Sequence, residues 1–318
     1  MGLRRRDPSK NSNNFHLPFI CFSFLLDSLM ILSDEHLTHF EEQGYVVVEE
    51  FYPEELRAQI SEAIRESHPP WEFYKDKPKD EKPYFQVSKD FPYEHDIFNK
   101  LTVCPDLIDF AQRILGTKDI HLRYAHNWAK YPLNEERKSK VHVDNGNCSQ
   151  LPRGGQEFGQ MHTWYFPDGV TEDEAPMFVV PKPYGRDVSK KISLVVPPGT
   201  MVIFSAHFWH SATDFKGTEG QRYSVSRLYG RADHYWEGLG SYVNLGNNDR
   251  YRKFIGTLTA KEREIFKFPP AGHPYYTLET LAMLEEQYPG WNAGDEYAPG
   301  ETIVATDDLY IAGLPNDE

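Results

Sequence analysis

Residues 192–204 read ISLVVPPGTMVIF. This stretch contains two short apolar runs, Ile192–Val196 and Met201–Phe204, separated by the turn Pro197-Pro198-Gly199-Thr200. Proline presets the backbone of a turn and glycine tolerates a positive φ, so the pattern predicts two strands joined by a tight turn. Similar apolar or aromatic runs lie at Ile120–Tyr131, Met177–Val180 and Tyr223–Tyr229. Short strands separated by turns rich in Pro and Gly indicate a β sandwich or barrel.

Helical patterns flank this strand-rich region. Ser33 is a typical N-cap for a helix that ends at Gly44, and Pro53 suits the first turn of a second helix. Near the other end, Thr259 and Glu262 have the spacing of a capping box, and leucines around Leu281 mark a last helix. The sequence therefore predicts a mainly β protein with flanking helices.

We expect one domain, residues 30–318, preceded by an N-terminal extension, residues 1–29, that is disordered or not native. An alternative for the extension is a signal or anchor, because three arginines precede the apolar run Leu17–Leu26. That run is too short and interrupted to predict a membrane span with any force. Residues 69–99 are rich in Pro, Lys and Asp without a period, which predicts a long loop that could act as a lid.

Composition limits the partners. With 34 Lys and Arg against 48 Asp and Glu, the chain of 318 residues has a net charge of −14. A nucleic-acid binder needs clustered cations, so we expect no nucleic-acid partner, and we expect no membrane partner either. The three cysteines, Cys21, Cys104 and Cys148, are far apart and form no CxxC pair. This argues against disulfides and a cysteine zinc site, and favours a cytoplasmic protein.

Two pieces of the central region could meet at a metal. In the tripeptide His142-Val143-Asp144, a strand would turn the imidazole and the carboxylate toward one face. His210 follows Asp144 by 66 residues, enough chain for several strands to bring it back to the same place. Two histidines and one carboxylate are the ligands of a facial triad. His207 is three residues from His210 and would face the other side, so we choose His210.

A third piece suggests an anchor for a carboxylate. Arg222 follows His210 by 12 residues, and on a returning strand its side chain would point into the same pocket. Ser224 shares that face of the strand, so a guanidinium and a hydroxyl could hold one carboxylate together. Arg227 is the rival anchor, and an ordinary surface ion pair is the alternative role for Arg222.

The order and spacing of these pieces resemble the phytanoyl-CoA dioxygenase-like family of Fe(II)/2-oxoglutarate-dependent oxygenases. The resemblance covers about residues 33–230 and includes Lys130 upstream of His142 and the acidic stretch Thr171-Glu172-Asp173-Glu174-Ala175-Pro176 ahead of a strand. The family often continues with Pro-Gly-Ser-His where this chain has Pro181-Lys182-Pro183-Tyr184. Since that loop often borders the substrate, the substrate stays open.

The resemblance implies a fold, a ligand set and a reaction. The fold would be a double-stranded β-helix, a cupin-like jelly roll. The family's metal ligands carry over to His142, Asp144 and His210, which are also the catalytic residues. Its 2-oxoglutarate-binding arginine carries over to Arg222, and Lys130 and Trp164 lie where the family often lines the cosubstrate pocket. Ser224 joins this cosubstrate site by its place on the strand beside Arg222. The cofactors would be Fe(II), 2-oxoglutarate and molecular oxygen.

The implied activity is hydroxylation of a small-molecule or acyl substrate, with release of succinate and CO2. A carboxylate at Asp144 favours hydroxylation over halogenation, because related halogenases have a small residue there. Two alternatives stay open from the residues alone. One is a cupin-like binding protein without catalysis, and the other is a metal-dependent hydrolase that uses His142 and Asp144 and gives Arg222 no role.

Overall fold

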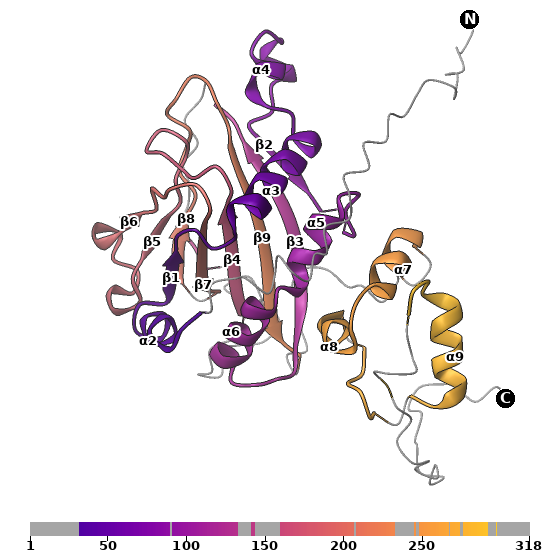
Figure 1. Cartoon of the computed structure of the whole chain (residues 1–318). Helices are drawn as coiled ribbons and strands as arrows, with labels where there is room; N and C mark the ends of the chain where they lie inside the picture. Colours follow the sequence, from indigo (N-terminus) through magenta and orange to yellow (C-terminus); the bar gives the residue numbers. More distant parts are fainter. Residues whose placement is uncertain are drawn as a thin grey trace, which may run out of the picture.

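The computed structural model of the chain is drawn in Figure 1. It describes residues 32–89, 91–132, 141–143, 160–206, 208–232, 245, 248–266, 268–273, 276–291 and 297. The predicted extension, residues 1–29, lies outside these residues.

A six-stranded sheet forms the larger wall of the protein, and its strands lie in the order β1-β7-β4-β9-β3-β2. Every neighbouring pair is antiparallel. The strands are β1 (Tyr45–Val48), β2 (Phe85–Ser88), β3 (Ile120–Lys130), β4 (Gln160–Phe166), β7 (Thr200–Ser205) and β9 (Arg222–Arg231). The strands predicted from the apolar runs in the middle of the chain are therefore confirmed, with bounds moved by one to three residues.

A smaller sheet faces it, with the order β6-β5-β8. Its strands are β5 (Phe178–Val180), β6 (Ile192–Ser193) and β8 (Trp209–Ser211). His142 extends this sheet through an isolated bridge to His210. From β3 onward the chain alternates between the two sheets: β3, the His142 bridge, β4, β5 with β6, β7, β8 and β9. This alternation is the double-stranded β-helix that the sequence was expected to form.

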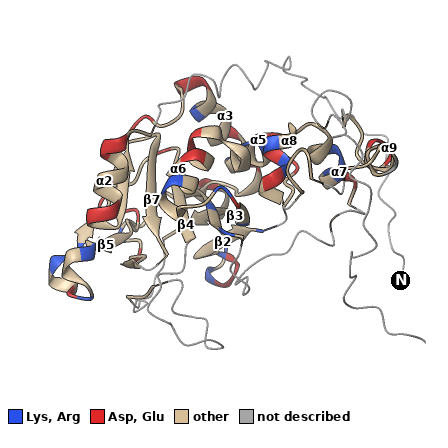
Figure 2. Ribbon diagram, turned by 90° about the horizontal axis from the view of Figure 1, so that it is seen from below, with Lys and Arg blue, Asp and Glu red and all other residues tan. Residues whose placement is uncertain are grey.

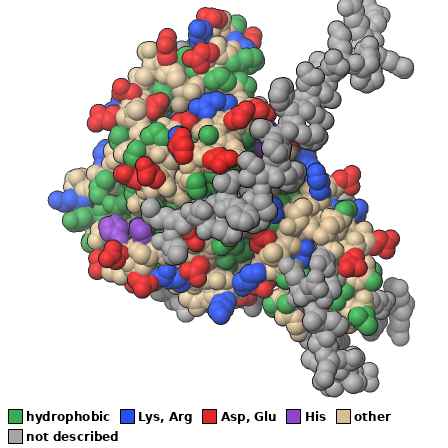
Figure 3. All heavy atoms as spheres, in the orientation of Figure 1, with side chains coloured by type: hydrophobic (Ala, Val, Ile, Leu, Met, Phe, Trp, Pro, Cys, Tyr) green, Lys and Arg blue, Asp and Glu red, His purple; other side chains and the backbone are tan. Residues whose placement is uncertain are grey.

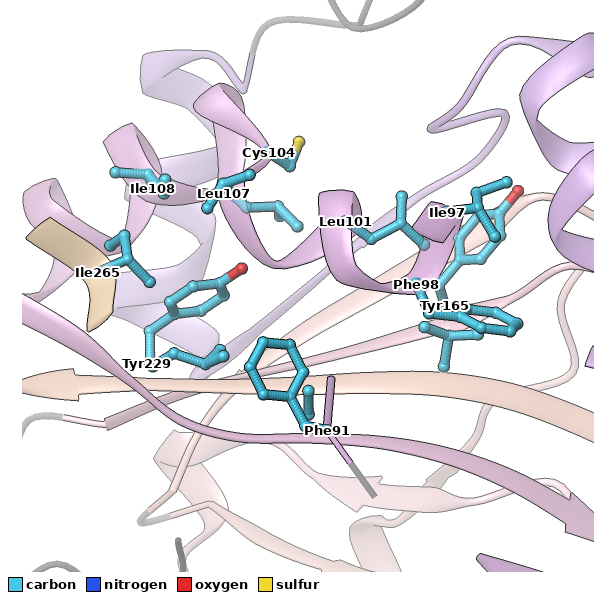
Figure 4. Packing of buried hydrophobic residues seen from close by; sticks show 14 of the residues in the cluster. Phe91, Ile97, Phe98, Leu101, Cys104, Leu107, Ile108, Tyr165, Tyr229 and Ile265 are labelled. Carbon is cyan, nitrogen blue, oxygen red and sulfur yellow. The ribbon is translucent and has the colours of Figure 1, made fainter. Parts of the chain in front are cut away.

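The outer face of the large sheet is covered by helices. These are α2 (Asp34–Gln43), α3 (Glu54–Ser67), α5 (Asp96–Lys100) and α6 (Pro105–Leu115). The helix α6 buries five apolar side chains on one stripe, and β-strand residues such as Tyr165 and Tyr229 meet them from the sheet. Figure 4 shows part of this packing, with Leu107 and Ile108 above Tyr229. The strand residues that pack in this core face the helices. Because side chains alternate along a strand, the residues between them face inward.

Three C-terminal helices pack beside the sheet on the side of β3 (Figure 1). They are α7 (Asp249–Gly256), α8 (Ala260–Arg263) and α9 (Leu278–Gln287). The predicted capping box is present. The Thr259 hydroxyl oxygen accepts from the backbone N–H of Glu262, and the Glu262 carboxylate accepts from the backbone N–H of Thr259. The guanidinium carbon of Arg263 lies 3.8 Å from the ring centroid of Trp291.

The prediction of a long loop over residues 69–99 was wrong. The chain there forms α4 (Trp71–Tyr74), the 3-10 turn η1 (Lys79–Glu81), β2 and α5. The strand β2 pairs with Asn127–Lys130 of β3 and becomes the edge of the large sheet. Four residues are too few to show a period in the sequence, and the pairing partner lies about forty residues away.

The helices of the described residues are short, and the longest of them, α3, has 14 residues. None of these helices combines the length and the hydropathy that a membrane crossing requires.

Candidate functional site

Two histidines from distant parts of the chain lie side by side at the small sheet. The backbone N–H of His142 donates to the carbonyl of His210 at 3.0 Å, and the N–H of His210 donates back at 3.0 Å. Their ring centroids are 4.5 Å apart, with an angle of 50° between the planes. His210 is buried and His142 is exposed. The fold therefore brings together two imidazoles that the sequence analysis had grouped.

A hydrogen bond fixes how the His210 ring is protonated. Its Nδ1 lies 2.9 Å from the carbonyl oxygen of Phe208. A carbonyl oxygen can only accept, so Nδ1 carries a proton, and in the neutral ring Nε2 carries the lone pair. Many metal-binding histidines are held by such a bond from the second nitrogen. The Phe204 ring supports the other side, with centroids 5.0 Å apart.

The third predicted ligand, Asp144, lies outside the described residues, and so does His207. Within the described part of the chain, no three His, Cys, Asp or Glu side chains are grouped as a metal site would require.

Arg222 begins β9 and lies on the inner face of the large sheet. It is 3% exposed, and its Nη1 donates to the carbonyl of Ala175. The Nε atom is buried and has no hydrogen-bond partner among the described residues. Burial lowers the pKa of the guanidinium to about 10, so it stays charged at neutral pH. A buried cation with an unused donor is suited to binding an anion, because such groups are costly when left unpaired.

Lys130 and Ser224 lie beside Arg222. Lys130 is paired with Arg222 across β3 and β9, is 4% exposed, and donates through Nζ to the carbonyl of Thr213. Ser224 is fully buried, and its hydroxyl has no partner among the described residues. Because Arg222 and Ser224 are two apart on one strand, they share the inner face. Two buried cations and one unused hydroxyl therefore lie close together.

Trp164 lies on the inner face of β4, two strands from Lys130. Its ring stacks on that of Trp128, with centroids 5.5 Å apart and 17° between the planes. The indole Nε1–H of Trp164 is buried without a partner in the described structure, whereas that of Trp128 donates to Ser226 at 2.6 Å. The inner face thus offers a further buried donor, on the strand that neighbours β9.

Sequence reasoning missed a row of rings that leads to His210. The hydroxyl oxygen of Tyr124 is 3.1 Å from Nδ1 of His162. The His162 ring stacks on the Phe204 ring, with centroids 4.9 Å apart and 5° between the planes. Phe204 in turn contacts His210. The only sequence signal for His162 was its position, two residues before Trp164 and therefore on the same face.

Arg227, the rival anchor, lies on the opposite face. It is 2% exposed and donates to the carbonyls of Phe98, in α5, and Ser226. Because five residues separate it from Arg222, the alternation of a strand turns the two side chains to different sides. Arg227 therefore joins the sheet to its helical cover and does not reach the inner face.

Comparison with known proteins places the chain in a family. Residues 40–222, more than half of the chain, match the family described as phytanoyl-CoA dioxygenase (PhyH). Among curated proteins none matches the sequence. Similar solved structures include the 2-oxoglutarate-dependent carbocyclase SnoK of nogalamycin biosynthesis, with 18% identity, a TM-score of 0.49, and coverage of 70% of this chain and 92% of that one. Another is the epimerase SnoN, with 18% identity, a TM-score of 0.47, and coverage of 63% of this chain and 82% of that one. HygX from Streptomyces hygroscopicus has 13% identity, a TM-score of 0.47, and coverage of 64% of this chain and 88% of that one.

Proposed function

Because the chain belongs to the phytanoyl-CoA dioxygenase family, we propose that it hydroxylates a small-molecule or acyl substrate and releases succinate and CO2. The family's cofactors are Fe(II), 2-oxoglutarate and molecular oxygen. The observation that carries the proposal is the pairing of His142 with His210 in the same barrel as the buried guanidinium of Arg222.

The donor set suits Fe(II). His142, Asp144 and His210 would hold the metal by two nitrogens and one oxygen, which leaves open positions for a cosubstrate and oxygen. The bond from His210 Nδ1 to Phe208 supports this role, because it directs the Nε2 lone pair away from the backbone. The bound iron and 2-oxoglutarate would supply the oxidising chemistry that the side chains lack.

The polar inner face suits 2-oxoglutarate, a small dianion. Nε of Arg222 and the hydroxyl of Ser224 are buried donors without a partner in the described residues, and a carboxylate accepts from both. Lys130 would add a second positive charge beside Arg222. Trp164 would donate its indole N–H and form one wall.

The chain also shields the Arg222 end of the site from water. Phe166, Val202, Phe204 and Phe208 belong to an apolar cluster that includes residues of both sheets. Arg222 lies against this cluster, with its guanidinium carbon 5.8 Å from the Phe166 ring centroid. Exclusion of water strengthens the attraction between the cations and a bound dianion.

The test is succinate release from 2-oxoglutarate by the purified protein with Fe(II), with and without oxygen. We expect slow oxygen-dependent release even before the substrate is known. His210→Ala should lose Fe(II) binding and turnover, while His68→Gln serves as a matched control for a buried histidine at the end of α3, away from the site. Full iron affinity in His210→Ala would refute the ligand assignment. Turnover that needs no oxygen would favour a hydrolase, and failure to bind 2-oxoglutarate would favour a binding protein.

A further inference from the structure

A basic and apolar segment projects from the small sheet. We define it as the arm, residues 182–195, which contains the 3-10 turns η4 (Lys182–Tyr184) and η5 (Val188–Lys190) and the strand β6. Apart from Leu194, every residue of the arm is exposed. In Figure 1 the arm lies at the left edge of the molecule, around the label β6.

The charge of the arm is opposite to that of the chain. Four cations against one carboxylate give the arm a net charge of +3, whereas the whole chain carries −14. The arm's charged residues are Lys182, Arg186, Asp187, Lys190 and Lys191. Arg186, Lys190 and Lys191 form no ion pair with a described carboxylate. Figure 2 shows basic residues gathered on the turn that projects beyond β5.

Apolar side chains alternate with these cations. Tyr184 is 50% exposed, Val188 41%, Ile192 42% and Val195 47%. These are four of the eight large hydrophobic side chains that are exposed in the described residues, and they fall within 12 positions. In the space-filling view of Figure 3, blue and green atoms meet at the left edge. Exposed hydrophobic side chains that gather on one projecting segment, as on the arm, mark an interaction surface.

The arm is held in this shape by its own bonds. The backbone of Gly185 donates to Lys182 at 3.1 Å and that of Lys190 to Asp187 at 3.0 Å. The Asp187 carboxylate also accepts from the backbone and hydroxyl of Ser189. Leu194 is 5% exposed and packs into the cluster between the sheets. A preformed arm loses little conformational entropy when it binds.

We propose that the arm docks the protein on a bilayer surface rich in anionic lipids. The lysines and Arg186 would contact headgroup phosphates, and Tyr184, Val188 and Ile192 would enter the boundary between headgroups and acyl chains. A soluble polyanion would use the cations but leave these apolar side chains in water. This departs from our expectation of no membrane partner, because that expectation rested on composition, which averages over the chain.

The first experiment measures co-sedimentation of the full chain with vesicles of phosphatidylcholine, with or without roughly one third phosphatidylserine. We expect binding to the anionic vesicles alone, weakened by high salt because the Debye length shortens. Lys190→Glu with Lys191→Glu should reduce binding about tenfold or more. The control, Lys118→Glu with Lys253→Glu, makes the same change in net charge on exposed residues elsewhere and should bind like the wild type.

A second variant tests the apolar part. Val188→Ser with Ile192→Ser keeps every charge, and we expect it to lose the binding that survives high salt. The proposal is overturned if the wild type fails to bind anionic vesicles at low salt, or if the arm and control variants bind equally. Arm-dependent binding of polyglutamate without binding to vesicles would also overturn it, in favour of an acidic protein partner. Thermal unfolding of each variant checks that the fold is intact.

Discussion

The guanidinium of Arg222 donates a hydrogen bond to the carbonyl of Ala175, a residue whose φ is 55°. Residues other than glycine seldom adopt this left-handed backbone, and each such residue costs about 1 kcal/mol or more. The acidic stretch that ends at Pro176 therefore takes an unfavourable turn that brings a backbone acceptor to the buried cation. This bond holds one side of the guanidinium, and Nε keeps its proton for another partner.

Arg222→Lys tests what the planar guanidinium contributes to 2-oxoglutarate binding. Lysine keeps the charge but has no Nε and no planar pair of donors. If the guanidinium binds a carboxylate of 2-oxoglutarate, the dissociation constant should rise about 10- to 100-fold, as expected for lost charge-assisted hydrogen bonds. Calorimetric titration under nitrogen measures this value, and Fe(II) affinity should stay unchanged. An unaltered dissociation constant for 2-oxoglutarate would remove Arg222 from the cosubstrate site.

Ala175 allows a test of the backbone turn by itself. Ala175→Gly should keep or raise stability, by up to about 1 kcal/mol, because glycine tolerates the positive φ. Ala175→Val should destabilise the protein by about 2 kcal/mol and weaken 2-oxoglutarate binding, because a β-branched residue resists this conformation and is fully buried here. Urea unfolding and titration of the two variants provide the comparison. Equal stability of both would show that the turn is not strained.

The strands of the barrel were predictable because each has a local signal. Apolar runs bounded by Pro and Gly placed β5, β7 and β9, and the cap residues Ser33 and Thr259 placed two helix starts. The bridge between His142 and His210 has no such signal. It depends on which strands become neighbours, and the spacing and the family resemblance grouped the two residues only as candidate metal ligands.

Other features could not be read from the sequence, because they depend on pairing at long range. The strand β2 gains its hydrogen bonds from β3, so a segment that resembles a loop became an edge strand. The sequence also left open whether Arg222 or Arg227 is the carboxylate anchor. Two arginines five residues apart must face opposite sides of a strand, but only the core of the folded protein decides which side is inside.

Lys130→Met tests the second cation of the proposed cosubstrate site. Methionine keeps the length and apolar stem of lysine but removes the charge beside Arg222. We expect the Michaelis constant for 2-oxoglutarate to rise about tenfold, the value of a modest electrostatic contribution, while the turnover number changes little. Lys100→Met is the matched control, since that lysine also donates to a backbone carbonyl, of Thr257, but lies among the helices. A similar change in both variants would indicate a general effect of charge.

A buried histidine predicts how acid destabilises the fold. His68 ends α3, and burial lowers its pKa from the usual 6.5 to about 4. Between these two pH values the unfolded chain binds a proton that the folded protein excludes, so stability is full above pH 6.5 and falls as the pH drops toward 4. The loss should be on the order of 3 kcal/mol. Urea unfolding across this range measures it, and His68→Gln should flatten the slope by about one proton. Parallel pH profiles for wild type and variant would show that another group carries the acid sensitivity.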